Sequence, residues 1–439
     1  MLVSNDITGD LRPDLVVDVG WSATVFSSVG RGFDLSTAIP SGSVIPITPS
    51  GAMVLTTLYA SPGDVDGDGY ADLIITAADS SAVTFDRFEL PVGGNVFVFS
   101  WPLMGNLDLT LDYSAYLFTD SEVPAYLGAS VAALGDLNDD GFDDFAVGGG
   151  VDDYHAYYDD EVEVSRAWVF HGPVAGEHTV ESIAQAQIDV GEGSYIKAGA
   201  NVASAGDQDG DGVTDLLVGS PYFPLESPSG RSSGAVFLFL SPVGDFTTWR
   251  DADATVGQTG DPDGMGSLGY SLDGNTDSNG DGQSDLLVGA FTYSGSVPRG
   301  GAAFVQHGPL RGPMDIIDTA AILEGTEEWG LAGMHVKALG DIDGDDKDDM
   351  LVSGQGEHLE LYEGSGTAWI LYGGIEGRHE GWKPGDWSIA EIRGSKDGLH
   401  FGYSLAGGQD LDGDGWLDFL IGDPYWNEGT VALFWGGPT

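Results

Sequence analysis

A nine-residue segment, Asp207–Asp215, carries acidic side chains at its first, third, fifth and ninth places. Gly210 and Gly212 lie between these places and let the backbone turn tightly enough for the four carboxylates to face one point. Carboxylate oxygens gathered in this way bind hard divalent cations, and calcium accepts the largest number of them. The segment therefore predicts a calcium site.

The same segment occurs in seven copies, which we call loops 1 to 7. They begin at Asp6, Asp64, Asp136, Asp207, Asp277, Asp341 and Asp410, and successive starts are 58, 72, 71, 70, 64 and 69 residues apart. A nearly constant period of this length predicts a repeat architecture.

The predicted ligands in each loop are the side chains at the first, third, fifth and ninth places and the backbone carbonyl at the seventh. In loops 2 to 7 they are Asp64, Asp66, Asp68, Tyr70, Asp72, Asp136, Asn138, Asp140, Phe142, Asp144, Asp207, Asp209, Asp211, Val213, Asp215, Asp277, Asn279, Asp281, Gln283, Asp285, Asp341, Asp343, Asp345, Lys347, Asp349, Asp410, Asp412, Asp414, Trp416 and Asp418. Loop 1 is the weakest copy, since Thr8 replaces an acid and Leu11 a glycine; its ligands would be Asp6, Thr8, Asp10 and Asp14.

We therefore expect six or seven calcium ions. Four side chains and a carbonyl would nearly fill each coordination shell, whereas catalytic calcium needs an open place. The expected role is structural.

An EF-hand loop opens with a similar pattern but requires a bidentate Glu at its twelfth place and a helix on each side. Here the twelfth places are β-branched residues within short apolar runs: Val17, Ile75, Val147, Val218, Val288, Val352 and Ile421. Such runs predict buried strands, so we place each loop between two β-strands.

The strands are clearest in the last unit, where 401–406, 419–422 and 429–435 predict a first, second and third strand. Residues 387–393 predict the fourth strand of the unit before it. Four short antiparallel strands with turns between them make one propeller blade. The sequence thus predicts an all-β fold, a single seven-bladed β-propeller over 1–439 whose last blade lacks its outer strand. The approximate blades are 1–50, 51–119, 120–193, 194–260, 261–328, 329–394 and 395–439.

Two short elements carry a resemblance to a known family. Phe401-Gly402, loop 7 and the run Leu420-Ile-Gly-Asp-Pro424 resemble an FG-GAP repeat, as does Leu217-Val-Gly-Ser-Pro221 after loop 4. The array is similar to the β-propeller of integrin α-subunits and its bacterial relatives. This resemblance implies calcium in loops 2 to 7, and it is more specific for fold than for function.

The composition limits the class of protein. Seven calcium ions would reduce the formal charge of −55 only to about −41, which disfavours binding to nucleic acid or anionic membranes. The chain has no cysteine, and we find neither a signal peptide nor a membrane-spanning run. Multi-carboxylate sites suit extracellular calcium levels. We expect an extracellular or cell-surface protein that is monomeric or part of a larger chain.

In a four-stranded blade the connections alternate between two ends, so the calcium loops lie at one end and the second-to-third turns at the other. Aromatic residues in the latter turns could stack on sugars or hold a cationic group. The candidate ligand residues are Tyr154, His155, Tyr157, Tyr158, Tyr222, Tyr293, Tyr425 and Trp426. The alternative for Tyr222, Tyr293 and Tyr425 is that they brace the turn.

We interpret the chain as a calcium-binding recognition or adhesion module for a protein or glycan ligand. No catalytic motif is present, so we do not expect an enzyme. Two alternatives stay open: a polysaccharide lyase or hydrolase on a propeller scaffold, and a structural spacer of a larger surface protein.

Overall fold

The computed structural model describes residues 2–4, 6, 8, 12–19, 22–26, 44–48, 58–77, 94–100, 103, 107–108, 112–119, 127–149, 164–192, 201–221, 223, 233–257, 266–356, 366–381, 388–394, 400–423 and 430–437. It forms two compact units. The first contains Met1–Ser194, Pro242–Thr248 and Gln409–Gly415, and the second contains Tyr195–Ser241, Trp249–Gly408 and Trp416–Thr439.

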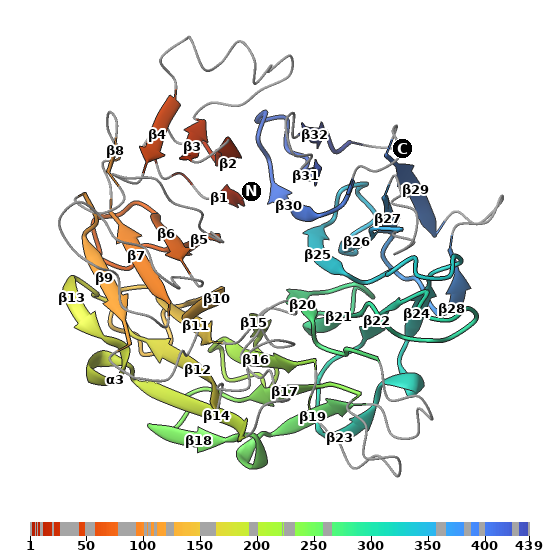
Figure 1. The fold of residues 1–439 in the computed structure, drawn as a ribbon, viewed down its shortest axis with the longest axis horizontal. Coiled ribbons are helices and arrows are strands. Elements are labelled where there is room, and N and C mark those ends of the chain that lie inside the picture. The colour runs from red at the N-terminus through yellow and green to blue at the C-terminus, as the bar shows by residue number, and fades with distance from the viewer. Residues whose placement is uncertain are drawn as a thin grey trace. The chain divides into compact units, whose positions relative to one another are not determined.

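The first unit contains three sheets, each with four antiparallel strands in chain order (Figure 1). They are β1 (Leu2–Ser4), β2 (Asp14–Val19), β3 (Ser22–Phe26) and β4 (Val44–Thr48); β5 (Tyr59–Gly63), β6 (Asp72–Ala77), β7 (Asn95–Phe99) and β9 (Ala115–Phe118); and β10 (Leu127–Gly135), β11 (Asp144–Gly149), β12 (Val164–Phe170) and β14 (Ala186–Glu192).

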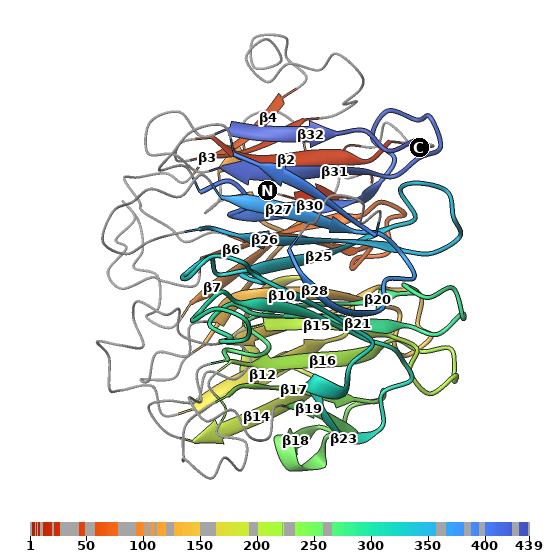
Figure 2. The ribbon, with the colours of Figure 1, turned by 90° about the vertical axis from the view of Figure 1, so that its right-hand side faces the viewer.

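The second unit repeats this arrangement three times, and Figure 2 shows neighbouring strands such as β15, β16 and β17 side by side. The strands are β15 (Asn201–Gly206), β16 (Asp215–Ser220), β17 (Ala235–Phe239) and β19 (Ala254–Gly257); β20 (Ser271–Thr276), β21 (Asp285–Ala290), β22 (Ala302–Gln306) and β24 (Ala321–Glu324); and β25 (His335–Gly340), β26 (Asp349–Gly354), β27 (Thr367–Leu371) and β29 (Ile389–Arg393). A last sheet has three strands, β30 (Ser404–Gln409), β31 (Asp418–Asp423) and β32 (Thr430–Phe434).

These sheets give a β-propeller fold with six complete blades rather than the seven expected. The last sheet has only three strands, because no fourth strand follows β32 within the residues that the structure describes.

Within the residues that the structure describes, five blades carry a fifth strand that the sequence did not predict. It follows the third strand of one blade and pairs, in parallel, with the fourth strand of the blade before it. These strands are β8 (Leu107–Asp108), β13 (Gly176–Thr179), β18 (Phe246–Thr248), β23 (Gly312–Asp315) and β28 (Gly377–Glu380), on β4, β9, β14, β19 and β24 respectively. Three of them run into a single helical turn, α3 (Val180–Ile183), η2 (Trp249–Asp251) or η3 (Ile316–Asp318), which redirects the chain.

The second strand of each sheet anchors a predicted metal loop. In β6, β11, β16, β21, β26 and β31 every residue is buried, and the first residue of each is the ninth-place aspartate. Their Val, Leu and Ile side chains pack between neighbouring sheets and hold the strand in place. Each loop therefore leaves a first strand and ends on a rigid second strand, as predicted, and not between helices. No helix in the described part of the chain is long and apolar enough to cross a membrane.

Candidate metal centre

In loops 2 to 7 the first-place aspartate is the acceptor around which the loop folds. In loop 2, Oδ1 of Asp64 accepts hydrogen bonds from the N–H groups of Gly67 (2.7 Å) and Asp68 (3.0 Å), and Oδ2 accepts one from Gly69 (2.8 Å). The fifth- and sixth-place N–H groups make the same bonds in loops 3 to 7. These bonds draw the backbone round the carboxylate.

In loops 3 and 4 the N–H groups also favour the ionised form of the first-place carboxylate. They lower the pKa of Asp136, where the largest contribution is from Gly141, and of Asp207, where it is from Gly212. A carboxylate binds a metal ion in its ionised form, so these side chains are ready for coordination.

This backbone path needs left-handed residues at the fourth and sixth places. Gly210 and Gly212 have φ of +83° and +90°. Aspartate stands in for glycine twice, as Asp139 at the fourth place of loop 3 (φ +59°) and Asp346 at the sixth place of loop 6 (φ +64°). Aspartate tolerates this conformation better than most residues, so loops 3 and 6 keep the same path.

The ninth-place aspartate is the fixed, buried member of each set. In loop 4, Oδ2 of Asp215 accepts from the N–H of Gln208 (2.8 Å) and Oδ1 accepts from the N–H of Ser241 (2.8 Å). Burial raises the pKa of Asp215 and also that of Asp144 and Asp285, and the hydrogen bonds that each carboxylate accepts oppose the rise. In loops 2 and 6 burial raises the pKa of Asp72 and Asp349 to about 7.

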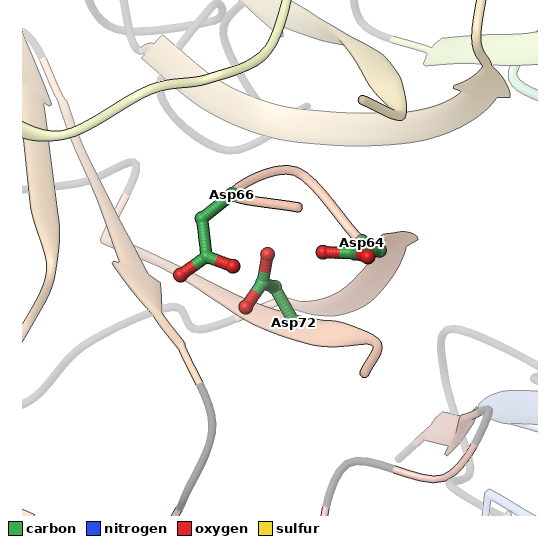
Figure 3. A group of neighbouring side chains, drawn as sticks. All are labelled: Asp64, Asp66 and Asp72. Atoms are coloured by element: carbon green, nitrogen blue, oxygen red, sulfur yellow. The ribbon is translucent and has the colours of Figure 1, made fainter. Parts of the chain in front are cut away.

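The loop carboxylates converge. In Figure 3 the carboxylates of Asp64, Asp66 and Asp72 face a common space. Oxygen atoms of the first-, third- and ninth-place residues lie within 4.8 Å of one another in three loops that each lie within one unit: Asp64, Asp66 and Asp72; Asp207, Asp209 and Asp215; and Asp341, Asp343 and Asp349. In loops 3 and 5 the third place is held by Asn138 and Asn279, so an amide replaces one carboxylate. Loop 7 is divided between the two units, and within it Asp410 accepts the bonds typical of a first-place residue.

This donor set fits a hard cation such as calcium. All of the converging groups are oxygen ligands, and an ion would relieve the repulsion between carboxylates. In loop 6, burial and the neighbouring Asp345 and Asp341 raise the pKa of Asp343. The Oδ1 atom of Asp343 is buried without a hydrogen-bond partner among the described residues. Buried polar atoms of this kind are rare unless an ion or water satisfies them.

Loop 1 differs from the others. Thr8, at its third place, donates hydrogen bonds to the ninth-place Asp14 from its backbone N–H and its hydroxyl. Both oxygens of that carboxylate are therefore bonded to the third-place residue, which is itself a predicted ligand. Asp10 lies outside the described residues.

Two eighth-place aspartates were missed by the sequence prediction. Asp143 of loop 3 contacts loop 2: its Oδ2 accepts from the N–H of Asp64 (2.8 Å), and its own N–H donates to the Asp64 carbonyl (2.8 Å). Asp348 of loop 6 makes the same pair of bonds to Asp277 of loop 5, at 2.8 and 3.0 Å. Both positions are visible in the sequence as an Asp-Asp pair at the end of a loop.

The predicted ligand residues can be placed in one case. The side chain of Tyr293 is 7% exposed and its ring lies edge-on to Phe304, with centroids 5.4 Å apart. This is the packing expected of a residue that braces the turn. The other candidates, Tyr154, His155, Tyr157, Tyr158, Tyr222, Tyr425 and Trp426, lie outside the described residues.

Another pair of residues, Arg299 and Trp329, lies at the end of blade 5 where the turn that contains Tyr293 is found. Arg299 lies in the turn from β21 to β22, and its guanidinium carbon is 4.3 Å from the ring centroid of Trp329, which follows β24. Both have left-handed backbones, with φ of +49° and +63°. The Trp329 N–H donates to the Pro298 carbonyl (3.2 Å), which joins the two turns. A bulky residue with this φ is a true outlier, and such strain occurs mostly at functional positions.

Comparisons with known proteins agree with the repeat pattern. The FG-GAP repeat family model matches residues 60–99, 198–239 and 401–434. Integrin alpha-5 of Xenopus laevis is 30% identical over 226 residues, which are 51% of this chain and 20% of that protein. Integrin alpha pat-2 of Caenorhabditis briggsae is 26% identical over 282 residues, or 61% of this chain and 21% of that protein.

A phosphatidylinositol-glycan-specific phospholipase D of Rattus norvegicus is 30% identical over 259 residues, 56% of this chain and 28% of that protein. The matches thus span between about a fifth and just over a quarter of these relatives. Among solved structures, the exotype rhamnogalacturonan lyase YesX matches 99% of this chain and 74% of its own with 13% identity, but a TM-score of 0.33 supports no conclusion.

Proposed function

Since this chain carries FG-GAP repeats and is similar to integrin α chains, we propose that it is a calcium-stabilised recognition module. It acts outside the cell or at the cell surface and binds a protein or glycan. The observation that carries the calcium part is the convergence of first-, third- and ninth-place carboxylates in loops 2, 4 and 6.

The calcium sites belong to loops 2 to 7, with the side-chain ligands named above and the seventh-place carbonyls completing each shell. Bound calcium supplies positive charge that offsets the repulsion between carboxylates. The protein's own residues do the rest: hydrogen bonds from loop N–H groups to the first-place carboxylate shape each loop, and buried ninth-place residues such as Asp215 fix it to the sheet. The result is a rigid set of first-to-second-strand connections at one end of each blade.

Recognition takes place at the opposite end, in the second-to-third turns and the connections between blades. Arg299 and Trp329 support this assignment, because a cation stacked on an indole presents both donor groups and an aromatic edge. Arg and Trp are also enriched among the residues that dominate binding energy at interfaces. The turn that contains Tyr154, His155, Tyr157 and Tyr158 and those that contain Tyr222, Tyr425 and Trp426 are further candidate contacts.

The test is binding of the calcium-loaded protein to immobilised matrix proteins and polysaccharides, with each captured glycan checked for shortening. We expect capture without shortening, and Trp329→Ala or Arg299→Ala should weaken it at least about tenfold. Phe246→Ala is the matched control, because Phe246 is an exposed aromatic (63%) on the outer strand β18. Shortening of a glycan would favour the lyase or hydrolase instead, and absence of any capture would favour the spacer.

A further inference from the structure

In two pairs of adjacent loops, 2 and 3 in the first unit and 5 and 6 in the second, an eighth-place aspartate forms hydrogen bonds with the preceding loop. Asp143 binds both backbone polar groups of Asp64 in loop 2, and Asp348 does the same for Asp277 in loop 5. We propose that Asp143 and Asp348 are positioning residues that couple calcium binding in loop 3 to loop 2 and in loop 6 to loop 5. This inference rests on the proposed calcium sites and adds cooperativity to them.

The coupling path is short and is made of groups already described. Asp144, the ninth-place ligand of loop 3, directly follows Asp143 in the chain and is held by the N–H groups of Leu137 (2.8 Å) and Gly172 (2.9 Å). An ion on Asp144 restricts the backbone at 143–144. Asp143 passes that restriction to Asp64, whose carboxylate organises loop 2. Ordering of one loop therefore reduces the entropy that the next must lose on binding, which is positive cooperativity.

A residue without a side chain makes room for the Asp143 carboxylate beside loop 2. Gly63 directly precedes Asp64, and a Cβ on Gly63 would lie 2.0 Å from Oδ2 of Asp143. In the second pair a threonine takes the place of the glycine. Thr276 precedes Asp277, and its hydroxyl donates to Oδ2 of Asp348 (3.3 Å), the oxygen that also accepts from the Asp277 N–H. Two different local sequences accommodate one contact, which indicates that the contact itself is the common feature.

The remaining loops do not have this carboxylate. The eighth place is Ala71 in loop 2, Thr214 in loop 4, Ser284 in loop 5 and Leu417 in loop 7. Loops 4 and 5 are joined differently, because the amide of Gln208 donates to the Ser284 carbonyl (2.7 Å). The coupling we propose is thus specific to the pairs 2–3 and 5–6.

The experiment measures calcium binding by isothermal titration calorimetry in the wild type, Asp143→Ala, Asp143→Asn and the control Thr214→Ala. Asp143→Ala should weaken binding at the loop 2 site about fivefold without changing the number of ions, and it should flatten the cooperative part of the isotherm. Asp143→Asn keeps an oxygen acceptor for the Asp64 N–H but removes the charge. Its calcium affinity at loop 2 should be close to that of the wild type, which would show that Asp143 acts by position and not by charge. Thr214→Ala should match the wild type, and Asp348→Ala should reproduce the loss at loop 5.

A double-mutant cycle distinguishes coupling from a general loss of stability. Asp144→Asn, which disables loop 3, should weaken loop 2 in the wild-type background but not in Asp143→Ala. Melting in chelator should be nearly the same for Asp143→Ala and the wild type, with the difference arising only in calcium. An isotherm for Asp143→Ala that superposes on the wild type would overturn this inference alone. A wild-type chain that binds no calcium would overturn the proposed function as well.

Discussion

Thr8 donates two hydrogen bonds to Asp14, one from its backbone N–H to Oδ2 (2.9 Å) and one from its hydroxyl to Oδ1 (3.1 Å). In loops 2 to 6 the ninth-place Oδ2 instead accepts from the second-place N–H, as Asp72 does from Val65 (2.8 Å). Loop 1 therefore satisfies its ninth-place carboxylate with its own third-place residue, and it has one acid fewer at the ligand places than loops 2, 4, 6 and 7.

The first prediction is that loop 1 binds no calcium until its third place carries a carboxylate in place of the Thr8 hydroxyl. Thr8→Asp supplies the missing third-place carboxylate and takes away the hydroxyl donor. Calorimetric stoichiometry should rise by one ion per chain in this variant, whereas Thr8→Ala should leave the stoichiometry unchanged. Equal stoichiometry in Thr8→Asp and the wild type would show that the loop 1 backbone itself excludes the ion.

Calcium removal should lower the stability of the fold. A ligand that binds only the folded state adds about 2.7 kcal/mol per site when its concentration is 100 times Kd. With three carboxylates converging in each of loops 2, 4 and 6, transfer from calcium to chelator should produce a large decrease in Tm, measured by differential scanning calorimetry. Magnesium is the control and should restore less, because it prefers a smaller, strictly octahedral shell. A Tm that is the same in calcium and chelator would contradict a structural role.

The calcium-free protein should be more stable in mild acid than at alkaline pH. Burial raises the pKa of Asp72 and Asp349 to about 7 from an ordinary value of 3.8, so the folded state holds these protons more tightly than the unfolded state. Their contribution to stability is complete below the unfolded pKa and is lost as the pH rises through about 7. Urea denaturation in chelator at several pH values measures this loss.

Calcium should reverse that trend, since protons compete with the ion for the same carboxylates. Asp72→Asn and Asp349→Asn remove the titrating groups, and the double variant should show a weaker pH dependence in chelator than the wild type. The interpretation fails if the double variant and the wild type lose stability in parallel between mild acid and alkaline pH.

The left-handed glycines of the loops should be intolerant of a side chain. Gly210 has φ +83° and no atom within 4 Å of a Cβ built on it, so only backbone strain opposes substitution. Gly210→Ala should cost about 1 kcal/mol of folding free energy. Gly244→Ala is the matched control, since Gly244 is equally uncrowded and outside the left-handed region. Equal Tm values for the two variants would show that loop 4 has another accessible backbone path.

Strands that consist mostly of apolar residues could be predicted from the sequence. β7, for example, spans Asn95–Phe99 and is buried at every residue. The parallel fifth strands could not be predicted. β13 (Gly176–Thr179) is exposed or half-buried along its length and has no apolar alternation, so only its pairing with β9 defines it.

The first-, third-, fifth- and ninth-place acids of the candidate site were evident from their spacing, since each loop is local in sequence. The roles of Asp143 and Asp348 depend on a neighbour 79 or 71 residues away, and no local pattern contains that information. Trp329 was missed for a similar reason: its partner Arg299 lies in another turn, and its left-handed φ is a property of the packed structure.

The parallel strands also set how repeats of this kind can be gained or lost in evolution. β23 belongs to the repeat that contains β22, yet it completes the sheet of β19 in the repeat before. Deleting one repeat unit removes its own blade and also uncovers the outer strand of its predecessor, whose free N–H and C=O groups would favour aggregation. Duplication or deletion is therefore tolerated only when the new neighbour brings an equivalent strand. For the same reason, a truncation after blade 4 should end beyond Asp315 rather than after Gly257.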